Sequence, residues 1–372
     1  MRKLLSPFVS SCLCSMIFLG FGCAVLVIFL TSCSVSIPVQ QETTRVKNDM
    51  LSVRYSILFF IHGDGDYLYH DTTGKEHIAD EEVLASAKKV AEKNPNAEVF
   101  IFHQKPASHF LFFFPLRDGE FYYYLKGKLI ANELYWRDQE VSNLDNEVKF
   151  YNSFRAESQS EIVRMFLYFG HEIPEFGGTG YDASYPDRAF TVRDLANGLK
   201  DLTMDSTKFD LMVLSTCYGG TPYTIGTLGP YARTIIASPD NLHLSYFDLS
   251  SLESLDLGLQ DGDIPAFAGR FARQSFDRLT GDIQTAVSVA VYDVDSVQEY
   301  LHSVYPIYEN TLNTLGEKKK SFPATIEHCD CADIPEYVLP TMNRGVNVFY
   351  RPALFGRLKS KQNHSGWECW KN

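Results

Sequence analysis

Two residues of this chain, a cysteine and a histidine, each follow directly on an apolar run. Cys217 ends the run at residues 209–217, and His171 ends the run at residues 163–171. A thiol becomes a strong nucleophile when a neighbouring imidazole manages its proton, so Cys and His together supply the parts of covalent catalysis. The pattern predicts Cys217 as a nucleophile and His171 as its base.

Short apolar runs bounded by turn residues are typical of strands buried in a parallel sheet. Residues 56–61 form a third such run, and residues 81–93 then show helical spacing before a strand at 98–102. This β-α-β order predicts a parallel sheet with right-handed crossovers. Ligands of open α/β sheets collect outside the carboxyl ends of the strands, so both candidate residues are expected at that edge.

The remaining segments predict further elements of an α/β fold. Aromatic residues 109–134 read as an antiparallel meander, because Asp118-Gly119 and Lys126-Gly127 are turn signals. A membrane-facing or ligand-binding surface is the alternative there. We expect further strands at 234–238 and 285–292, and helices at 145–158, 191–202, 221–231, 267–279 and 296–305. Residues 249–265 look like a loop, and the residues after 305 have weak periodicity.

The N-terminus has the features of an export signal. Arg2 and Lys3 precede an apolar segment at about 16–30, which ends in Leu30-Thr31-Ser32-Cys33. This ending resembles the lipobox of bacterial lipoproteins, in which the cysteine becomes the lipidated (palmitate-bearing) first mature residue. We predict a signal peptide at 1–32, lipidation at Cys33, a polar tether at 33–50, and attachment to the cell envelope outside the cytoplasm. An uncleaved anchor helix is the alternative.

The net charge and the cysteines of the chain indicate which partners and which cross-links to expect. A net charge of −12 without a basic cluster argues against a nucleic-acid partner. Export permits a disulfide, and we expect Cys369 to pair with either Cys329 or Cys331. A metal cluster is the alternative, formed by these three cysteines with His328 and His364. The Cys-x-Cys spacing fits no strong zinc pattern, so no metal site is predicted.

The order of these segments resembles the clostripain family of cysteine peptidases, which have a caspase-like fold. Residues 56–61 are similar to the first strand of that family, and Phe166-Leu-Tyr-Phe-Gly-His171 matches its block ending in histidine. Its helix and strand before the nucleophile match 191–199 and 208–217. Residues 133–150 and 236–238 are similar to its acidic lead-in segment and its strand beyond the nucleophile.

The resemblance implies a three-layer α/β/α sandwich with a mainly parallel sheet and an antiparallel hairpin insertion. It covers 55–305, so we expect a peptidase domain at 51–305 and a C-terminal extension at 306–372. The implied activity is endopeptidase cleavage of a peptide or protein substrate by Cys217 and His171. Backbone N–H groups after His171 and at Cys217 would bind the oxyanion. No cofactor is required, and a structural calcium is conceivable although no EF-hand spacing is present.

Two departures from the family pattern concern the substrate site. Glu172 stands where the family has glycine, and its charge is unfavourable near a developing oxyanion unless the side chain turns away. Ser215 stands where the family has an aspartate that contributes to the pocket for a basic side chain. Asp240 and Asp248 are candidate replacements, or surface carboxylates. We therefore predict no strict preference for cleavage after Arg or Lys.

Two alternatives remain open at the level of sequence. The departures at Glu172 and Ser215 also fit a catalytically inactive caspase-like lipoprotein. Such a protein would bind a protein or peptide partner in the cleft where the family binds its substrate. His62 follows the first strand and is either a second group of the active site or an ordinary loop histidine.

Overall fold

The computed structural model describes residues 53–63, 68–71, 73–111, 113–137, 143–155, 162–203, 207–242, 246–259, 263–317, 327–335, 337 and 345–371. The expected signal segment 1–32, the tether 33–50 and Cys33 lie outside these residues. All described residues belong to one compact unit.

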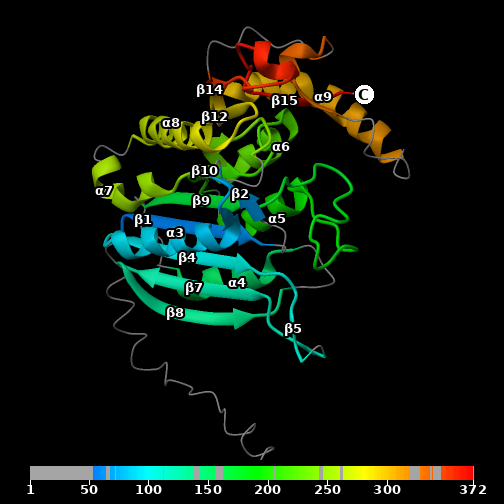
Figure 1. Ribbon diagram of the computed structural model, residues 1–372. Helices are drawn as coiled ribbons and strands as arrows, with labels where there is room; N and C mark the ends of the chain where they lie inside the picture. The colour runs from blue at the N-terminus through cyan, green and yellow to red at the C-terminus, as the bar shows by residue number, and fades with distance from the viewer. Residues whose placement is uncertain are drawn as a thin grey trace, which may run out of the picture. The chain divides into compact units, whose positions relative to one another are not determined.

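A nine-stranded sheet forms the centre of this unit (Figure 1). Its middle five strands run parallel, and the strands added at both edges pair antiparallel to their inner neighbours. The expected α/β fold with a mainly parallel sheet is therefore confirmed. The strand order is β14 (Val346–Arg351), β12 (Val287–Asp293), β11 (Ala232–Ala237), β10 (Phe209–Ser215), β9 (Val163–Phe169), β1 (Tyr55–His62), β4 (Ala97–Gln104), β7 (Gly119–Leu125) and β8 (Lys128–Tyr135).

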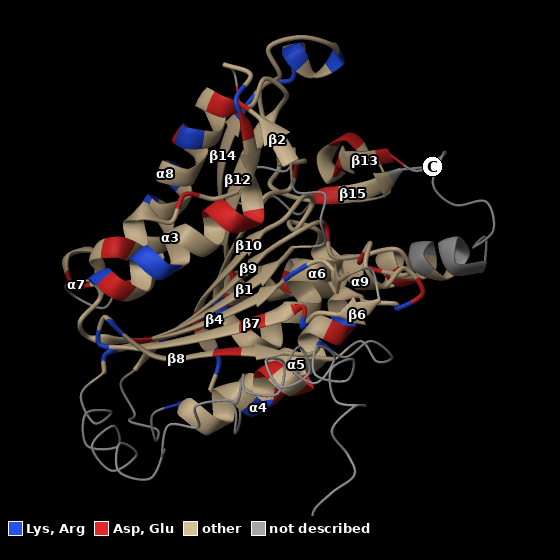
Figure 2. Ribbon diagram, turned by 60° about the horizontal axis from the view of Figure 1, so that its bottom comes forward, with Lys and Arg blue, Asp and Glu red and all other residues tan. Residues whose placement is uncertain are grey.

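Helices cover both faces of the sheet, as the edge-on view in Figure 2 shows. Charged residues gather on these helices and on the loops, while the strands between them are mostly uncharged. The result is the three-layer sandwich that the sequence predicts. One face carries α3 (Ala79–Lys93), α7 (Leu255–Gly258) and α8 (Ile264–Asp282), and the other carries α4 (Asp145–Phe154), α5 (Val192–Thr203), α6 (Pro222–Leu228) and α9 (Val294–Glu317).

Burial on both faces explains the continuous apolar runs of the central strands. In β1, Phe59 lies in the core beneath α3 and α8, while its neighbour Phe60 packs against Phe102 and Phe166 on the opposite face. Every residue of β1 is buried. A strand that meets helices on both sides has no polar face to display, so its pattern is continuous rather than alternating.

The aromatic segment at 109–134 is only partly the meander that the sequence predicts. β7 and β8 form an antiparallel hairpin on the outer side of β4, which confirms the hairpin insertion. The first expected strand is wrong, because residues 109–115 fold into a separate short hairpin of β5 (His109–Phe110) and β6 (Phe114–Pro115). β7 pairs directly with β4, so no edge remains there for a strand from 109–115. β2 (Leu68–His70) and β3 (Glu76–Ile78) form another small hairpin.

The expected boundary between 305 and 306 does not coincide with a structural one. α9 runs through it to Glu317, and β14 completes the edge of the main sheet beside β12. β13 (Glu327–Asp330) pairs antiparallel with β15 (Glu368–Lys371) in what we call the C-terminal hairpin. The C-terminal residues are therefore part of the same unit. Within the described part of the chain, no helix has the length and apolarity needed to span a bilayer.

A disulfide joins Cys331 to Cys369 and selects one of the two pairings that the sequence left open. Both residues are fully buried, and Cys329 is not part of a disulfide. Because Cys331 and Cys369 are joined in a disulfide, neither can offer a thiolate to a metal. The alternative metal cluster of three cysteines with two histidines is therefore excluded.

We expect loss of this disulfide to destabilise the unit measurably. The bridge closes a loop with a sequence separation of 38, for which the chain-entropy relation gives about 4 kcal/mol. A Cys331→Ala, Cys369→Ala variant should therefore unfold at a lower denaturant concentration than the parent in urea titrations. Cys329→Ala, measured beside it, removes a thiol that is not part of the bridge. An unchanged midpoint in the double variant would show that the bridge adds no stability.

Candidate active site

The two candidate catalytic residues follow the ends of adjacent parallel strands. β9 pairs with β10 in a register that matches Phe169 to Ser215. His171 and Cys217 each lie two residues beyond this matched pair, at the carboxyl edge of the sheet. The Gly170 N–H continues the ladder by donating to the Ser215 carbonyl at 3.4 Å. The structure thus brings the two strand ends together at the place where α/β sheets hold their ligands.

The thiol of Cys217 is held by the segment that follows β11. Its Sγ donates to the side-chain carbonyl oxygen of Asn241 at 3.2 Å and accepts the Leu242 N–H at 3.3 Å. Asn241 also hydrogen bonds to the Tyr218 hydroxyl, and this bond lowers the pKa of Tyr218. Burial has the larger effect and raises that pKa above its ordinary value. In this state the thiol is a hydrogen-bond donor, and its proton must leave Asn241 before attack. Catalytic contacts are often incomplete until substrate binds.

The turn after Cys217 has an unusual backbone. Tyr218 adopts a φ of 51°, in the left-handed region that bulky residues avoid. Its N–H donates to the Asp240 carbonyl, and the Gly220 N–H donates to the Ser238 carbonyl. These two amides are therefore committed to holding the turn and are not oxyanion donors. The bonds fix the Cys217 turn to the segment after β11.

The C-terminal hairpin lies against the neighbours of both candidate residues. His328 of β13 stacks on the Tyr218 ring with centroids 3.5 Å apart, and its Nε2 lies 3.4 Å from Glu172 Oε1. The Glu172 side chain thus has a polar partner in His328. Sequence reasoning missed Asn241, and it considered His328 only as a metal ligand and not as a neighbour of Glu172. His328 comes from a segment without periodicity, and Asn241 from a loop with no motif.

A second contact of the C-terminal hairpin involves a buried carboxyl group. Glu175, in the loop after β9, accepts hydrogen bonds from Trp370 Nε1 and from the hydroxyls of Thr221 and Thr224 at the start of α6. Burial raises the pKa of Glu175 to about 7, against the lowering effect of these donors. The group joins three segments that surround the candidate site.

Glu175 should make the stability of the protein depend on pH. Because its folded pKa, about 7, is above its ordinary value of 4.5, its stabilisation is complete below pH 4.5 and is lost as pH rises through 7. The shift corresponds to about 3 kcal/mol. Glu175→Gln keeps the shape and should be more stable than the parent at pH 8, with the advantage shrinking at pH 5. Thermal unfolding of the parent and of Glu175→Gln between pH 5 and pH 8 checks this prediction, with Glu133→Gln at an exposed position as the control. If the unfolding temperatures of parent and Glu175→Gln change with pH in parallel, the prediction is wrong.

The other predicted site residues have other partners. Ser215 is buried, and its hydroxyl accepts the Phe247 N–H at 2.9 Å. The Asp248 carboxylate accepts from Ser250 and from Gln274 of α8. Asp240 directs its carboxylate toward His364, with 4.0 Å between Oδ1 and Nε2. Thus Ser215 and Asp240 lie next to the Cys217 turn, while Asp248 binds groups on the α8 face.

His62 is the last residue of β1 and is buried, so the loop-histidine interpretation is wrong. Its Nδ1 lies 3.0 Å from the Gln104 amide oxygen, and its ring stacks on Tyr181. Its Nε2 faces Asp182 at 3.9 Å. Asp182 in turn binds Arg137 at 2.6 Å in a buried network. His62 also borders a small cavity with Gly170 and Ser215, which keeps it close to the candidate site.

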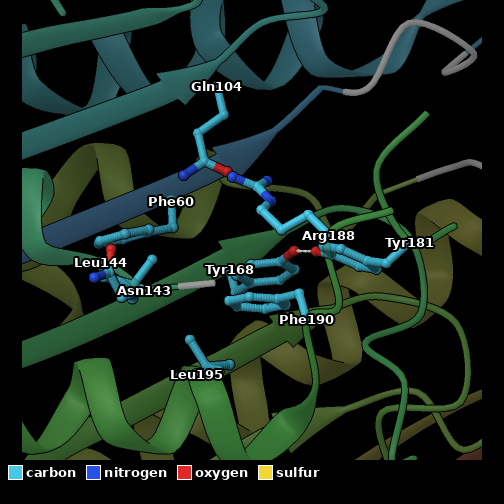
Figure 3. Close-up of a pocket in the computed structure, with 9 residues that line it drawn as sticks. All are labelled: Phe60, Gln104, Asn143, Leu144, Tyr168, Tyr181, Arg188, Phe190 and Leu195. Carbon is cyan, nitrogen blue, oxygen red and sulfur yellow. Dashed lines mark hydrogen bonds between the residues drawn. The ribbon is translucent and has the colours of Figure 1, made fainter. Parts of the chain in front are cut away.

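A further cavity lies on the other face of the sheet, beneath α5, and its lining does not include Cys217 or His171 (Figure 3). There the hydroxyl groups of Tyr168 and Tyr181 point toward each other and hydrogen bond. The lining residues are Phe60, Gln104, Asn143, Leu144, Tyr168, Tyr181, Arg188, Phe190 and Leu195.

Comparison with known proteins finds similarity in structure only. No protein-family model and no curated protein sequence matches the chain. Solved structures similar to it include an inactive zymogen C11 protease from Parabacteroides distasonis, at 15% identity and a TM-score of 0.44, covering 68% of this chain and 64% of that one. A secreted C11 cysteine protease from Bacteroides thetaiotaomicron, iotapain, has 10% identity and a TM-score of 0.48, with 69% and 70% covered.

A third similar structure is a secreted C11 protease of B. thetaiotaomicron in complex with an irreversible peptide inhibitor, at 14% identity and a TM-score of 0.46, with 70% of each chain covered. The C11 proteases are the clostripain family, to which the sequence shows its resemblance. The fold assignment itself rests on the strand order and the layers.

Proposed function

We propose that this chain is a cysteine-type endopeptidase that hydrolyses peptide bonds with Cys217 as nucleophile and His171 as base. The observation that supports this most is the matched ending of β9 and β10, which places a histidine and a cysteine at equal positions past one register pair. The similar structures are proteases.

In the first step of the proposed reaction, Cys217 transfers its thiol proton to His171, and Sγ attacks the scissile carbonyl carbon to give a tetrahedral oxyanion. That intermediate expels the amine, to which His171 returns the proton, and leaves a thioester on Cys217. Water, deprotonated by His171, then releases the carboxylic acid and regenerates the thiol. These steps call for no metal or organic cofactor, and the structural calcium that the resemblance allows stays a proposal.

Substrate choice follows from the groups around Ser215. A basic side chain needs a carboxylate to offset the loss of its hydration, and Ser215 offers only a hydroxyl that already accepts the Phe247 N–H. Asp248 binds Ser250 and Gln274, and Asp240 faces His364. We therefore propose no strict preference for Arg or Lys before the cleaved bond.

A peptide library tests the function and the preference together. The purified mature chain, residues 33–372, should cleave peptides of several types in a Cys217-dependent way. Cleavage after Arg or Lys alone would refute the proposed preference, and Asp240→Asn and Asp248→Asn would then identify the carboxylate responsible. No cleavage at all, with Cys217 unreactive toward thiol reagents, would refute the enzyme.

The second candidate function is an inactive caspase-like lipoprotein that binds a protein or peptide partner. The observation that favours it is the thiol hydrogen bond to Asn241, which keeps the proton on sulfur. In that case the parent should bind a partner or peptide without cleaving it, and Cys217→Ala should leave that binding unchanged. If the chain is an enzyme, the parent should cleave peptides, and Cys217→Ala should bind them without turnover.

We also propose that the chain is lipid-anchored to the bacterial envelope through Cys33, facing outside the cytoplasm. Cys33→Ser, expressed in a bacterial host, should lose incorporation of labelled palmitate and should leave the membrane fraction. The matched control is Cys23→Ser, within the apolar segment. Equal labelling of the Cys33 variant and the parent would rule out this anchor.

A further inference from the structure

Three buried polar atoms, two from residues four apart near the C-terminus and one from the segment after β11, lie in one group without hydrogen-bond partners. They are His364 Nε2, Asp240 Oδ2 and Glu368 Oε2. The His364 and Glu368 side chains are 1% and 3% exposed, and that of Asp240 is 18% exposed. Buried polar atoms are almost always paired, so three together require an explanation.

The distances within this group are too long for hydrogen bonds. His364 Nε2 lies 3.7 Å from Glu368 Oε2 and 4.0 Å from Asp240 Oδ1. One ligand atom of each residue lies within 4.8 Å of the other two. Across a tetrahedral zinc ion with bonds of about 2.0 Å, ligand atoms are roughly 3.3 Å apart. The ligand atoms would therefore have to approach one another by about 0.4 to 1.5 Å around such an ion.

The charges also favour a cation. A third carboxylate, Asp330, lies 3.9 Å from His364 Nε2 but accepts from the N–H groups of Ser365 and Ala332 and pairs with Lys361. Asp330 thus has cationic and N–H partners of its own, whereas Asp240 and Glu368 both face the His364 imidazole.

We propose that Asp240, His364 and Glu368 bind a divalent transition-metal ion of the zinc class. One imidazole nitrogen and two carboxylate oxygens suit zinc, whereas calcium and magnesium favour all-oxygen sites. A fourth position is open to water. The sequence predicts no metal here because the three residues share no recognised motif.

Binding requires a change at the histidine. The Gly366 N–H donates to His364 Nδ1 at 3.0 Å, so a neutral ring carries its proton on Nε2. A metal at Nε2 displaces that proton to Nδ1, and the Gly366 contact then opens. The competing occupant is the proton itself, held as an imidazolium among the carboxylates.

The site would connect the C-terminal hairpin to the candidate active site. Glu368 is the first residue of β15, and the Asp240 carbonyl accepts the Tyr218 N–H beside Cys217. Asn241, the residue after Asp240, accepts a hydrogen bond from the Cys217 thiol. A metal at Asp240 would therefore stiffen the segment that holds the thiol, although the site does not depend on the proposed peptidase activity.

The test is zinc binding by the mature chain after chelator treatment, measured by calorimetry and by elemental analysis after dialysis. We expect about one Zn²⁺ per chain, with a Kd at least about 100-fold weaker in Glu368→Gln and in His364→Ala. Asp333→Asn, which alters an exposed carboxylate paired with Lys361, should bind as the parent does. Calcium should bind more weakly than zinc.

Glu368→Gln preserves size, and circular dichroism confirms that it is folded. Because the readout is binding, failure of peptidase activity does not affect it. Zinc binding that is absent in the parent, or equally strong in Glu368→Gln and the parent, would overturn the proposal and leave the proton as the occupant.

Discussion

Replacement of Cys217 by alanine is expected to lower kcat/KM for peptide hydrolysis by at least about 10³-fold, to the background of the assay. The reason is that alanine has no atom to form the acyl-enzyme, while the strand end that positions it stays intact. The matched control is Cys329→Ala, which removes the other cysteine outside the disulfide among the described residues and should retain activity.

His171→Ala should cause a loss of similar size, because the thiol would lose its proton acceptor. The double variant Cys217→Ala, His171→Ala should be no slower than either single variant, since groups that act as a unit are not additive. Activity that survives either single change would contradict the dyad.

The second large effect is expected at His328. Its imidazole lies 3.4 Å from the Glu172 carboxylate, next to His171 in the chain. His328→Ala would leave the Glu172 charge without this partner near the place where an oxyanion develops, which raises the barrier. We expect kcat to fall by about 10–100-fold with little change in KM.

A second substitution separates charge from packing. Glu172→Gln in the His328→Ala background removes the stranded charge and should restore most of kcat. If the double variant stays as slow as His328→Ala, the loss comes from the missing ring stack on Tyr218, which lies 3.5 Å from His328, and the electrostatic account is wrong.

The central sheet was predictable because its signal is local. β1, β9 and β10 are largely buried on both faces, so each appears in the sequence as a mostly apolar run that ends at or just before a candidate site residue. The same logic failed for residues 109–115, where aromatic content predicts a strand but the edge of β4 is already taken by β7.

The surroundings of the site depend on contacts between distant segments. His328 and Trp370 reach the loop after β9 through a hairpin closed by the Cys331–Cys369 disulfide. β14 is only six residues long and half-buried, so it carries no strong pattern. The sequence indicated that Glu172 must turn away from a developing oxyanion, but only the folded chain shows its contact with His328.

The most direct test of the dyad is labelling by a thiol-reactive peptide electrophile, read out by mass spectrometry of the intact mature chain and its proteolytic fragments. We predict one adduct per chain, on Cys217, formed at least about 100-fold faster in the parent than in His171→Ala. Label that reaches Cys329 as fast as Cys217, or Cys217 labelling at the same rate without His171, would contradict a Cys217–His171 dyad.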